Sequence, residues 1–291
     1  MTAVKALTRM LIPIGLALGL CATAVSADDQ EERDNPRDTT DVRSACTGLP
    51  SFGELQQALR DANTEPGGLK LPGVANNMWA TVVNRDGIVC AVAFTGPTRG
   101  DQWPGSRAIS AQKANTANAF SLAKFALSSA NLYAAVQPGG SLFGIQESNP
   151  VSTRAAYAGE PALYGTADDP LLGRRIGGVN VFGGGLALYR TNGEIAGGIG
   201  VSGDTSCRDH RVAWVARALL KLASVPAGVN PDPQRPDNII FDIGQGNATT
   251  LPTEGGRFLS TGGFGHPVCS GDEPALALGL PAVTQTNVAA K

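Results

Sequence analysis

The sequence predicts an α+β protein built on an antiparallel sheet flanked by helices, with a long inserted loop and a C-terminal extension. Two observations indicate this fold class. The β-rich segments come in two pairs, each joined by a short turn, and a helical segment follows each pair. Helices therefore do not separate single strands, as they do in a parallel sheet, so an antiparallel layer fits the order better.

The first 27 residues have the features of a secretory signal peptide. Lys5 and Arg9 precede the apolar run MLIPIGLALGLCATA, and small residues follow as far as Ala27. We therefore expect an exported protein, periplasmic or extracellular. No later apolar run reaches the roughly 18 residues that a spanning helix needs, so no membrane partner is expected.

Residues 28–44 are charged and polar with almost nothing to bury, which predicts a disordered acidic arm. A first helix is expected over residues 52–62, where Leu55, Ala58 and Leu59 recur at helical spacing. The α+β domain is placed at residues 45–222, and the remaining residues 223–291 form the extension.

The first predicted hairpin joins MWATVV to IVCAVAF through a turn that contains Asp86 and Gly87, because Asp-Gly between β-rich runs is typical of hairpins. Ser106 is then expected to cap a long alanine-rich helix over residues 107–133, which breaks near Ser121. The alanines leave part of its surface flat, so a sheet, another helix or a flat ligand can approach closely.

Residues 136–177 are expected to form a long loop, either a functional loop or a surface insertion. The second predicted hairpin joins GLALYR to EIAGGIGV through Asn192 and Gly193, and a helix follows from about Cys207 to Leu222. In the extension, only NIIFDI has a strand-like pattern. We expect the extension to pack on the core.

Charge and cysteine content limit the function. The chain has 23 basic and 25 acidic residues and no basic cluster, which argues against a nucleic-acid partner. Once Cys21 leaves with the signal peptide, four cysteines remain in an oxidising compartment, where disulfides are expected and three pairings are possible. We favour Cys46–Cys90 and Cys207–Cys269, because each would tie a terminal extension to the core.

The segment GGIGVSGDTSCRDH, residues 197–210, suggests two reactions that its context disfavours. Gly198, Gly200 and Gly203 have the spacing of a dinucleotide-binding turn, but the first two fall inside the second strand of a hairpin. A hydrolase elbow around Ser202 would need a glycine where Asp204 stands.

His210 in the same segment has two interpretations. It makes an ordinary surface or polar contact, or it binds a metal or haem iron. Cys207 lies three residues earlier on the same helix face, so the two could form half a metal site if Cys207 is reduced. A Cys207–Cys269 disulfide would also bring His266 near His210, which makes a two-histidine site conceivable.

Lys113 and Thr116 share one face of the alanine-rich helix. Two interpretations are open. In the first, Lys113 is solvated and Thr116 packs among the alanines. In the second, they supply a cation and a hydroxyl to a pocket that binds a carboxylate or propionate group.

The segments SRAISAQKANTANAFS and GGVNVFGGGLALYRTNGEIAGGIGVSGDTSCRDH resemble the GlcG/HbpS-like haem-binding family over roughly residues 52–222. The matching positions include a K-A-x-T-A helix, a G-G-V segment, a strand that ends in G-V-S-G, and an acidic residue in the next helix: Lys113, Thr116, Gly177, Gly178, Val179, Gly198, Gly200, Ser202, Gly203 and Asp209. The resemblance implies a profilin-like sheet, assembly into homo-oligomers, and haem or a similar flat ligand in some members. The chain departs from the family pattern at Asn180 and His210, in its long loop, in its cysteines and in its extension.

Three hypotheses follow. In the first, the protein is an exported small-ligand-binding protein with haem as the leading candidate. Lys113, Thr116 and Asp209 then belong to the pocket, Gly198 and Gly200 let the ligand approach the backbone, and His210 is the candidate iron ligand.

In the second hypothesis, the protein is an enzyme that acts on a 2-hydroxy or 2-oxo acid. Lys113, Asp209 and His210 then perform acid–base chemistry. In the third, it is a non-catalytic interaction domain stabilised by its disulfides.

Overall fold

A computed structural model describes residues 41–69, 72, 75–243, 253–254, 257–258 and 260–284. The predicted signal peptide and residues 28–40 of the predicted arm lie outside the described residues, so both stay predictions. The last residues of the arm differ from the expectation. They form a short helix, α2 (Val42–Ala45), capped by the Asp41 side chain, which accepts a hydrogen bond from the Arg43 amide.

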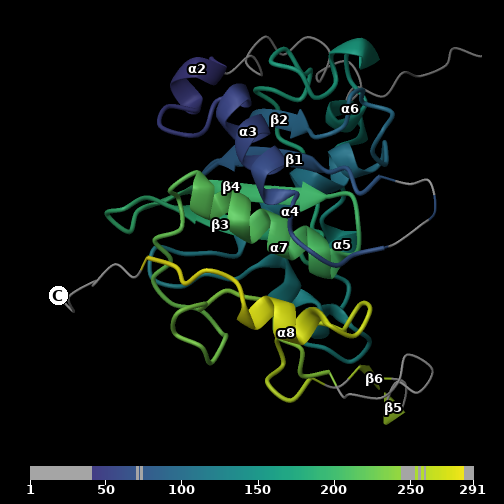
Figure 1. Ribbon diagram of the computed structural model, residues 1–291, viewed down its shortest axis with the longest axis vertical. Helices are drawn as coiled ribbons and strands as arrows, with labels where there is room; N and C mark the ends of the chain where they lie inside the picture. Colours follow the sequence, from purple (N-terminus) through teal and green to yellow (C-terminus); the bar gives the residue numbers. More distant parts are fainter. Residues whose placement is uncertain are drawn as a thin grey trace, which may run out of the picture. The chain divides into compact units, whose positions relative to one another are not determined.

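The centre of the described chain is a four-stranded antiparallel sheet (Figure 1). Its strands are β1 (Trp79–Asn84), β2 (Val89–Phe94), β3 (Gly185–Tyr189) and β4 (Ile195–Ser202), in the order β2-β1-β4-β3. Both predicted hairpins are present, and the pairing of β1 with β4 joins them into one sheet. The predicted α+β class is confirmed. Two-residue strands β5 (Thr253–Glu254) and β6 (Arg257–Phe258) pair separately.

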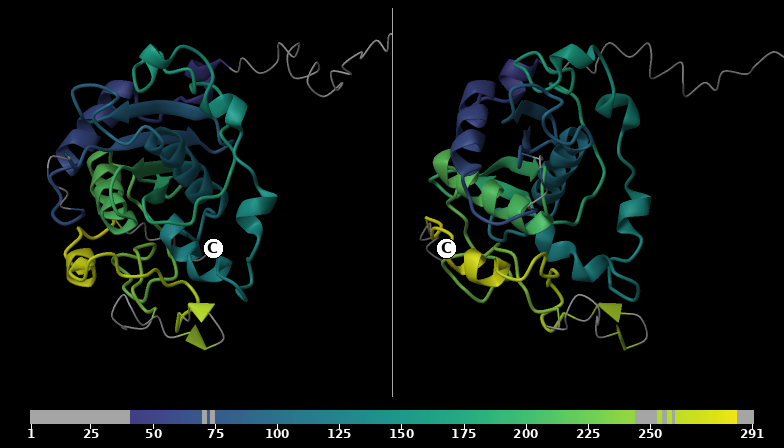
Figure 2. Two further views of the ribbon diagram at one scale, coloured as in Figure 1. Left: turned by 90° about the vertical axis from the view of Figure 1, so that its right-hand side faces the viewer. Right: turned by 45° about the vertical axis from the view of Figure 1, so that its right-hand side comes forward.

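Helices cover both faces of this sheet (Figure 2). Helices α3 (Phe52–Ala62) and α7 (Ser206–Leu219) lie on one face, where their apolar side chains share a core with the sheet. Helix α4 (Ser106–Ala119) lies on the other face, where Ala111 and Ala114 pack against Trp79 and Val83. Because both faces are covered, every residue of β1 is buried rather than every second one.

Helix α4 is shorter than the sequence suggests. Its N-cap is Gly105 rather than Ser106, and it ends at Ala119, close to the predicted break near Ser121. The buried Ser121 hydroxyl donates to the Leu127 carbonyl and accepts from the Leu127 amide, so it stabilises a turn instead of further helix. The chain then enters a short 3-10 helix, η2 (Ser129–Leu132).

The predicted loop over residues 136–177 contains short helical turns rather than none: η3 (Ala134–Val136), α5 (Ile145–Ser148), α6 (Thr153–Ala156) and η4 (Pro161–Leu163). A buried ion pair fixes it to α4, because the Arg107 guanidinium binds both carboxylate oxygens of Asp169. Arg107 also stacks on the Tyr164 ring, 3.7 Å from its centroid. The segment is therefore an anchored layer on this side of the sheet.

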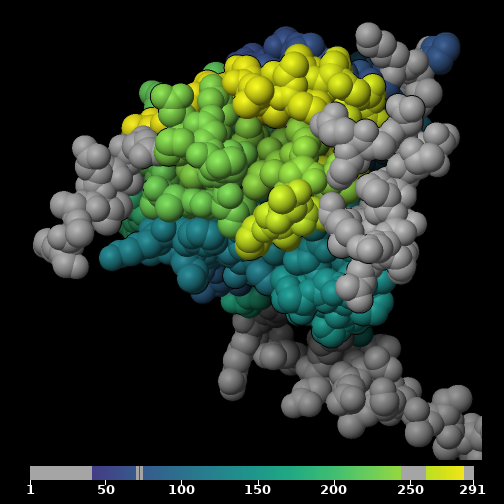
Figure 3. All heavy atoms as spheres, turned by 90° about the horizontal axis from the view of Figure 1, so that it is seen from below, coloured from purple at the N-terminus to yellow at the C-terminus, as the bar shows by residue number. Residues whose placement is uncertain are grey.

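Described parts of the C-terminal extension pack against α7. Helix α8 (Glu273–Leu278) lies beside α7, and the Trp214 indole donates to the Pro281 carbonyl over 2.9 Å. Green-to-yellow C-terminal segments form much of the surface in Figure 3. The strand predicted from NIIFDI is wrong: within it only Ile243 makes a bridge, to Ser260, because other backbone groups of the segment bind the histidines described below.

Two disulfides confirm the favoured pairing. Cys46–Cys90 joins the end of α2 to β2, and Cys207–Cys269 joins the start of α7 to the extension. None of the helices in the described part of the chain is long and apolar enough to cross a membrane.

Candidate functional site

Lys113 and Asp209 form a buried ion pair between α4 and α7, at the end of β4. The Lys113 Nζ lies 2.8 Å from the Asp209 Oδ2 and also donates to the Val201 carbonyl over 3.2 Å. Burial raises the pKa of Asp209 to about 6, although the neighbouring Lys113 opposes the shift. The two residues that the sequence singled out are therefore in contact. Each neutralises the charge of the other.

Asp209 reaches this position because α7 begins just before it. Thr205 is the N-cap, and its hydroxyl accepts from the Arg208 amide. In the first turn, the Asp209 Oδ1 accepts from the Asp204 amide over 2.9 Å. Asp209 is thus held by helix-capping contacts as well as by Lys113.

Thr116 lies near Lys113 on α4 but has a separate role. Its hydroxyl donates to the Gln112 carbonyl over 2.8 Å and accepts from the Asn180 amide over 2.9 Å. The side chain therefore fixes the segment before β3 instead of presenting a hydroxyl to a ligand.

Gly198 and Gly200 also have a role other than the expected one. We expected them to let a ligand approach the backbone, but the element that approaches is α4. A Cβ at Gly198 would collide with the Ala114 carbonyl oxygen, and one at Gly200 with the Ser110 carbonyl oxygen. The two glycines permit close packing of the helix on β4.

Gly183, Gly184 and Gly185 form a wall of the site that sequence reasoning missed. A Cβ at Gly184, where φ is +121°, would lie 3.1 Å from both the Lys113 Cδ and the Asp209 Cβ. A Cβ at Gly183 would lie 3.0 Å from the His210 Cβ. The signal was three consecutive glycines where a strand begins, a place where a turn needs only one glycine.

His210 is fully buried, behind Asp209 on α7. Its Nε2 lies 3.2 Å from both the Ile239 amide nitrogen and the Asn238 Oδ1, while its Nδ1 has no hydrogen-bond partner. Burial, with the positive charge of Arg217, lowers its pKa to about 3. The imidazole is therefore neutral at pH 7.

His266 lies in the extension and is only 1% exposed. Its Nδ1–H donates to the Pro267 carbonyl over 2.7 Å, which leaves the lone pair on Nε2, and Nε2 has no hydrogen-bond partner. The ring packs beside Tyr133 and Phe241, with centroid distances of 5.1 and 6.4 Å. Burial lowers its pKa to about 4.

Both histidines contact the same segment of the extension, His210 through the Ile239 amide and the His266 amide through the Ile240 carbonyl. One ring nitrogen of His266 lies within 4.8 Å of both sulfurs of Cys207–Cys269, and Cys207 lies one turn before His210 on α7. A site shared by the two histidines stays a prediction. We call His210, His266 and this disulfide the histidine corner.

Residues 237–243 and 264–269 of the extension cover the histidine corner, and we call them the cap. The Ile239 amide contacts His210, and the His266 amide donates to the Ile240 carbonyl over 2.7 Å. Asp237 forms a buried bidentate ion pair with Arg217, at 2.5 and 3.0 Å. The Ala134 amide donates to the Gly265 carbonyl, so the cap is also fixed to the inserted segment.

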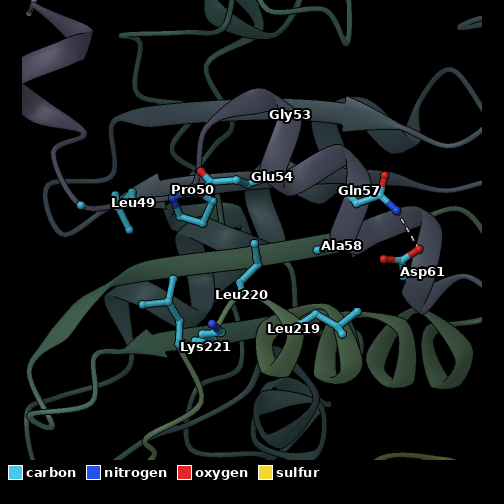
Figure 4. A pocket seen from close by; sticks show the side chains of 12 residues that line it. Leu49, Pro50, Gly53, Glu54, Gln57, Ala58, Asp61, Leu219, Leu220 and Lys221 are labelled. Carbon is cyan, nitrogen blue, oxygen red and sulfur yellow. Dashed lines mark hydrogen bonds between the residues drawn. The ribbon is translucent and has the colours of Figure 1, made fainter.

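A separate open groove of about 710 Å³ lies between α3 and the end of α7 (Figure 4). Leu219, Leu220 and Lys221 line one side. On the other, the Glu54 carboxylate caps its own helix and Gln57 donates to Asp61 over 2.8 Å. The described residues that line this groove include no histidine, cysteine or methionine.

These two places differ in their fit to haem. The histidine corner offers imidazole nitrogens without hydrogen-bond partners, which are ordinary ligands of haem iron, but the cap occupies the space beside them. The groove offers space without such a ligand. His266 and Cys269 belong both to the corner and to the cap, so haem would fit only if residues 237–243 of the cap moved away from His210.

A comparison with protein-family models matches residues 73–218 to the family described as haem degrading protein HbpS-like. No curated protein sequence matches the chain.

Three solved structures are similar. A PduOC:heme complex shares 22% identity, over 58% of this chain and 90% of that chain, with a TM-score of 0.39. The Klebsiella pneumoniae protein ORFY, of family DUF336, shares 22% identity over 59% and 90%, with a TM-score of 0.38. A double mutant of Streptomyces reticuli HbpS shares 15% identity over 58% and 83%, with a TM-score of 0.36.

Proposed function

The chain belongs to the HbpS-like family, and on that premise we propose that it is an exported protein that binds haem at the histidine corner. Two features support export: the signal-peptide pattern of residues 1–27, and the pairing of Cys46, Cys90, Cys207 and Cys269 into disulfides.

One observation carries the choice of site. The His210 Nδ1 and the His266 Nε2 are buried without hydrogen-bond partners. An unsatisfied buried polar atom costs about 1–3 kcal/mol, so these two atoms need an explanation. Imidazole is a common axial ligand of haem iron, and iron bound to the lone pair of the His266 Nε2 would supply that explanation. His210 would bind iron through Nδ1 with its proton on Nε2, donated to the Asn238 Oδ1.

The neighbouring residues suit the other parts of the same ligand. Tyr133 and Phe241 pack beside the His266 ring and offer apolar contact for a flat macrocycle. Lys113 offers a cation for a propionate, in exchange for its bond to Asp209. When bound, haem would supply an iron centre, and the chain's own residues would orient it and exclude water.

Residues 237–243 of the cap must move away from His210 for the ligand to enter, while His266 stays at the corner. The cap contacts that close the corner directly are the Ile239 contact to His210 and the Cys207–Cys269 disulfide. We therefore propose that haem affinity rises when this disulfide is reduced.

A hemin titration of the mature protein tests the proposal. We expect a shift of the Soret band on binding, and at least tenfold weaker binding in His266→Ala and in His210→Ala. Leu219→Ala, in the groove, is the matched control and should bind as the original protein does. If neither the oxidised nor the reduced protein shifts the band, or if the double histidine variant still does, the proposal is wrong.

A further inference from the structure

The histidine corner holds the residue types of a zinc site at a spacing typical of one. His266 and Cys269 are separated by two residues in the cap, and Cys207 comes from the first turn of α7. Ligands that come in closely spaced pairs, joined by one from another element, are typical of zinc sites with cysteine and histidine ligands.

The structure has brought these three residues together. Cys207, His266 and Cys269 each offer one ligand atom, and the three atoms all lie within 4.8 Å of one another. The two sulfurs are bonded to each other in the described form, so they cannot bind a metal as they stand. Reduction of the disulfide would therefore make all three atoms available as metal ligands.

We propose that reduction of the Cys207–Cys269 disulfide converts the histidine corner into a Zn²⁺ site, with Cys207, Cys269 and His266 as its ligands. Three protein ligands leave the fourth position of a tetrahedral zinc to water. This site does not depend on haem binding, since its ligands are defined without any macrocycle.

A second, independent observation supports His266 as a ligand. A metal-binding histidine usually donates its other ring N–H to a carbonyl or carboxylate, which fixes its tautomer and orientation. The Nδ1–H of His266 already donates to the Pro267 carbonyl in this way, and its Nε2 lone pair has no hydrogen-bond partner although the residue is 1% exposed.

The chemical step is thiol–disulfide exchange with a dithiol reductant. A thiolate of the reductant attacks the Cys269 sulfur, which belongs to a partly exposed residue, and the buried Cys207 sulfur leaves. The second thiol of the reductant then releases Cys269, and the reductant departs as its own disulfide with two electrons fewer. Binding of Zn²⁺ to the two cysteines displaces their thiol protons to solvent.

Zinc would then replace the disulfide as the link between α7 and the cap. In both forms one strong connection joins Cys207 to Cys269, so the extension stays docked whether the corner is oxidised or holds metal. The reduced, metal-free form alone would lack this connection.

Co²⁺, a spectroscopic substitute for Zn²⁺, tests the proposal on the full mature chain. We expect the protein reduced with a phosphine to bind one Co²⁺ with a thiolate-to-cobalt charge-transfer band, and added Zn²⁺ to abolish that band. The oxidised protein should show none. Cys207→Ser/Cys269→Ser should lose the band, and His266→Ala should bind at least tenfold more weakly. The matched control is Cys46→Ser/Cys90→Ser, which removes the other disulfide and should keep the band.

A measurement on the unmutated chain tests the zinc site without relying on variants that fail to fold. Zn²⁺ should slow alkylation of Cys207 and Cys269 at least tenfold in the reduced protein, while Cys46 and Cys90 react at unchanged rates. The absence of a Co²⁺ band in the reduced protein, or equal protection of all four cysteines, would overturn the zinc site. A positive cobalt result with no hemin binding would support this inference and reject only the haem proposal.

Discussion

At the scale of single residues, the two buried histidines determine how stability responds to acid. The folded pKa of His266 is about 4 and that of His210 about 3, whereas an unfolded histidine has a pKa of about 6.5. Below pH 6.5 the unfolded state therefore binds protons that the folded state does not, and stability falls as the pH drops toward 4. Asp209, whose folded pKa is raised to about 6, acts in the opposite direction over part of this range.

His266→Gln should reduce this acid sensitivity, because glutamine does not titrate. The difference in free energy of unfolding between the original protein and the variant should change by about 2–3 kcal/mol between pH 6.5 and pH 4. Asp209 is common to both proteins and cancels in the comparison. Urea titrations at several pH values measure the difference, and parallel stability curves for the two proteins would contradict it.

Replacement of glycine by alanine should have opposite effects on stability at Gly200 and at Gly53. An alanine Cβ at Gly200 would collide with the Ser110 carbonyl of α4, so Gly200→Ala should destabilise the protein by about 1–3 kcal/mol or more. A Cβ at Gly53, in α3, meets nothing within 4 Å, so Gly53→Ala should be neutral or stabilise by up to about 1 kcal/mol. Denaturation midpoints check both, and equal effects would show that α4 does not pack as described.

The site residues could be chosen from the sequence only by their chemical types. Helical spacing placed Lys113 and Asp209 on helices, but their pairing depends on how α4 and α7 pack at the end of β4, which no spacing shows. Gly200 was predicted to lie against a ligand, but it lies against α4. A glycine in a strand indicates that another group approaches the backbone closely, and it does not show whether that group belongs to a helix or to a ligand.

At the scale of elements, the Lys113–Asp209 pair is a direct bond between the helices on opposite faces of the sheet. Removing one partner of a buried pair leaves an uncompensated charge, so Lys113→Met should cost about 3–5 kcal/mol. Lys113→Met/Asp209→Leu should recover much of that loss, since two apolar side chains leave no buried charge. A double-mutant cycle in urea measures the coupling, and additive effects would show that the pair does not join α4 to α7.

The elements themselves were largely predictable because their signals are local. Asp86-Gly87 and Asn192-Gly193 located both hairpins, and apolar spacing located α3 and α7. The end of α4 and the irregular course of NIIFDI were harder to predict, since each depends on hydrogen bonds to distant residues. His210 and His266 bind the backbone of Ile239 and Ile240, which removes those groups from any strand.

At the scale of the whole molecule, the family pattern predicted the sheet and its helices but not the cap. Residues 223–284 have no clear periodicity, and the described parts of this segment are fixed to α7 by Cys207–Cys269 and by the Arg217–Asp237 pair. The disulfide pairing was the one sequence inference that linked distant segments correctly. Homo-oligomer formation, the acid–base enzyme and the interaction domain stay predictions.

The two disulfides should contribute equally to global stability and differently to local opening. They close loops of similar length, 44 and 62 residues apart, and loop entropy assigns each about 4 kcal/mol. Cys207→Ser/Cys269→Ser and Cys46→Ser/Cys90→Ser should therefore lower the free energy of unfolding by similar amounts. Amide hydrogen exchange should distinguish the two double variants, because Cys207–Cys269 holds the cap and Cys46–Cys90 holds α2.

In Cys207→Ser/Cys269→Ser we expect the amides of Ile239 and His266 to exchange at least tenfold faster, while the amides of α2 keep their rates. The other double variant should show the reverse pattern. The haem proposal requires the cap to open, so the exchange rate of the cap amides reports that step. If the cap amides exchange no faster without their disulfide, other contacts such as Arg217–Asp237 hold the corner closed, and reduction would not open it.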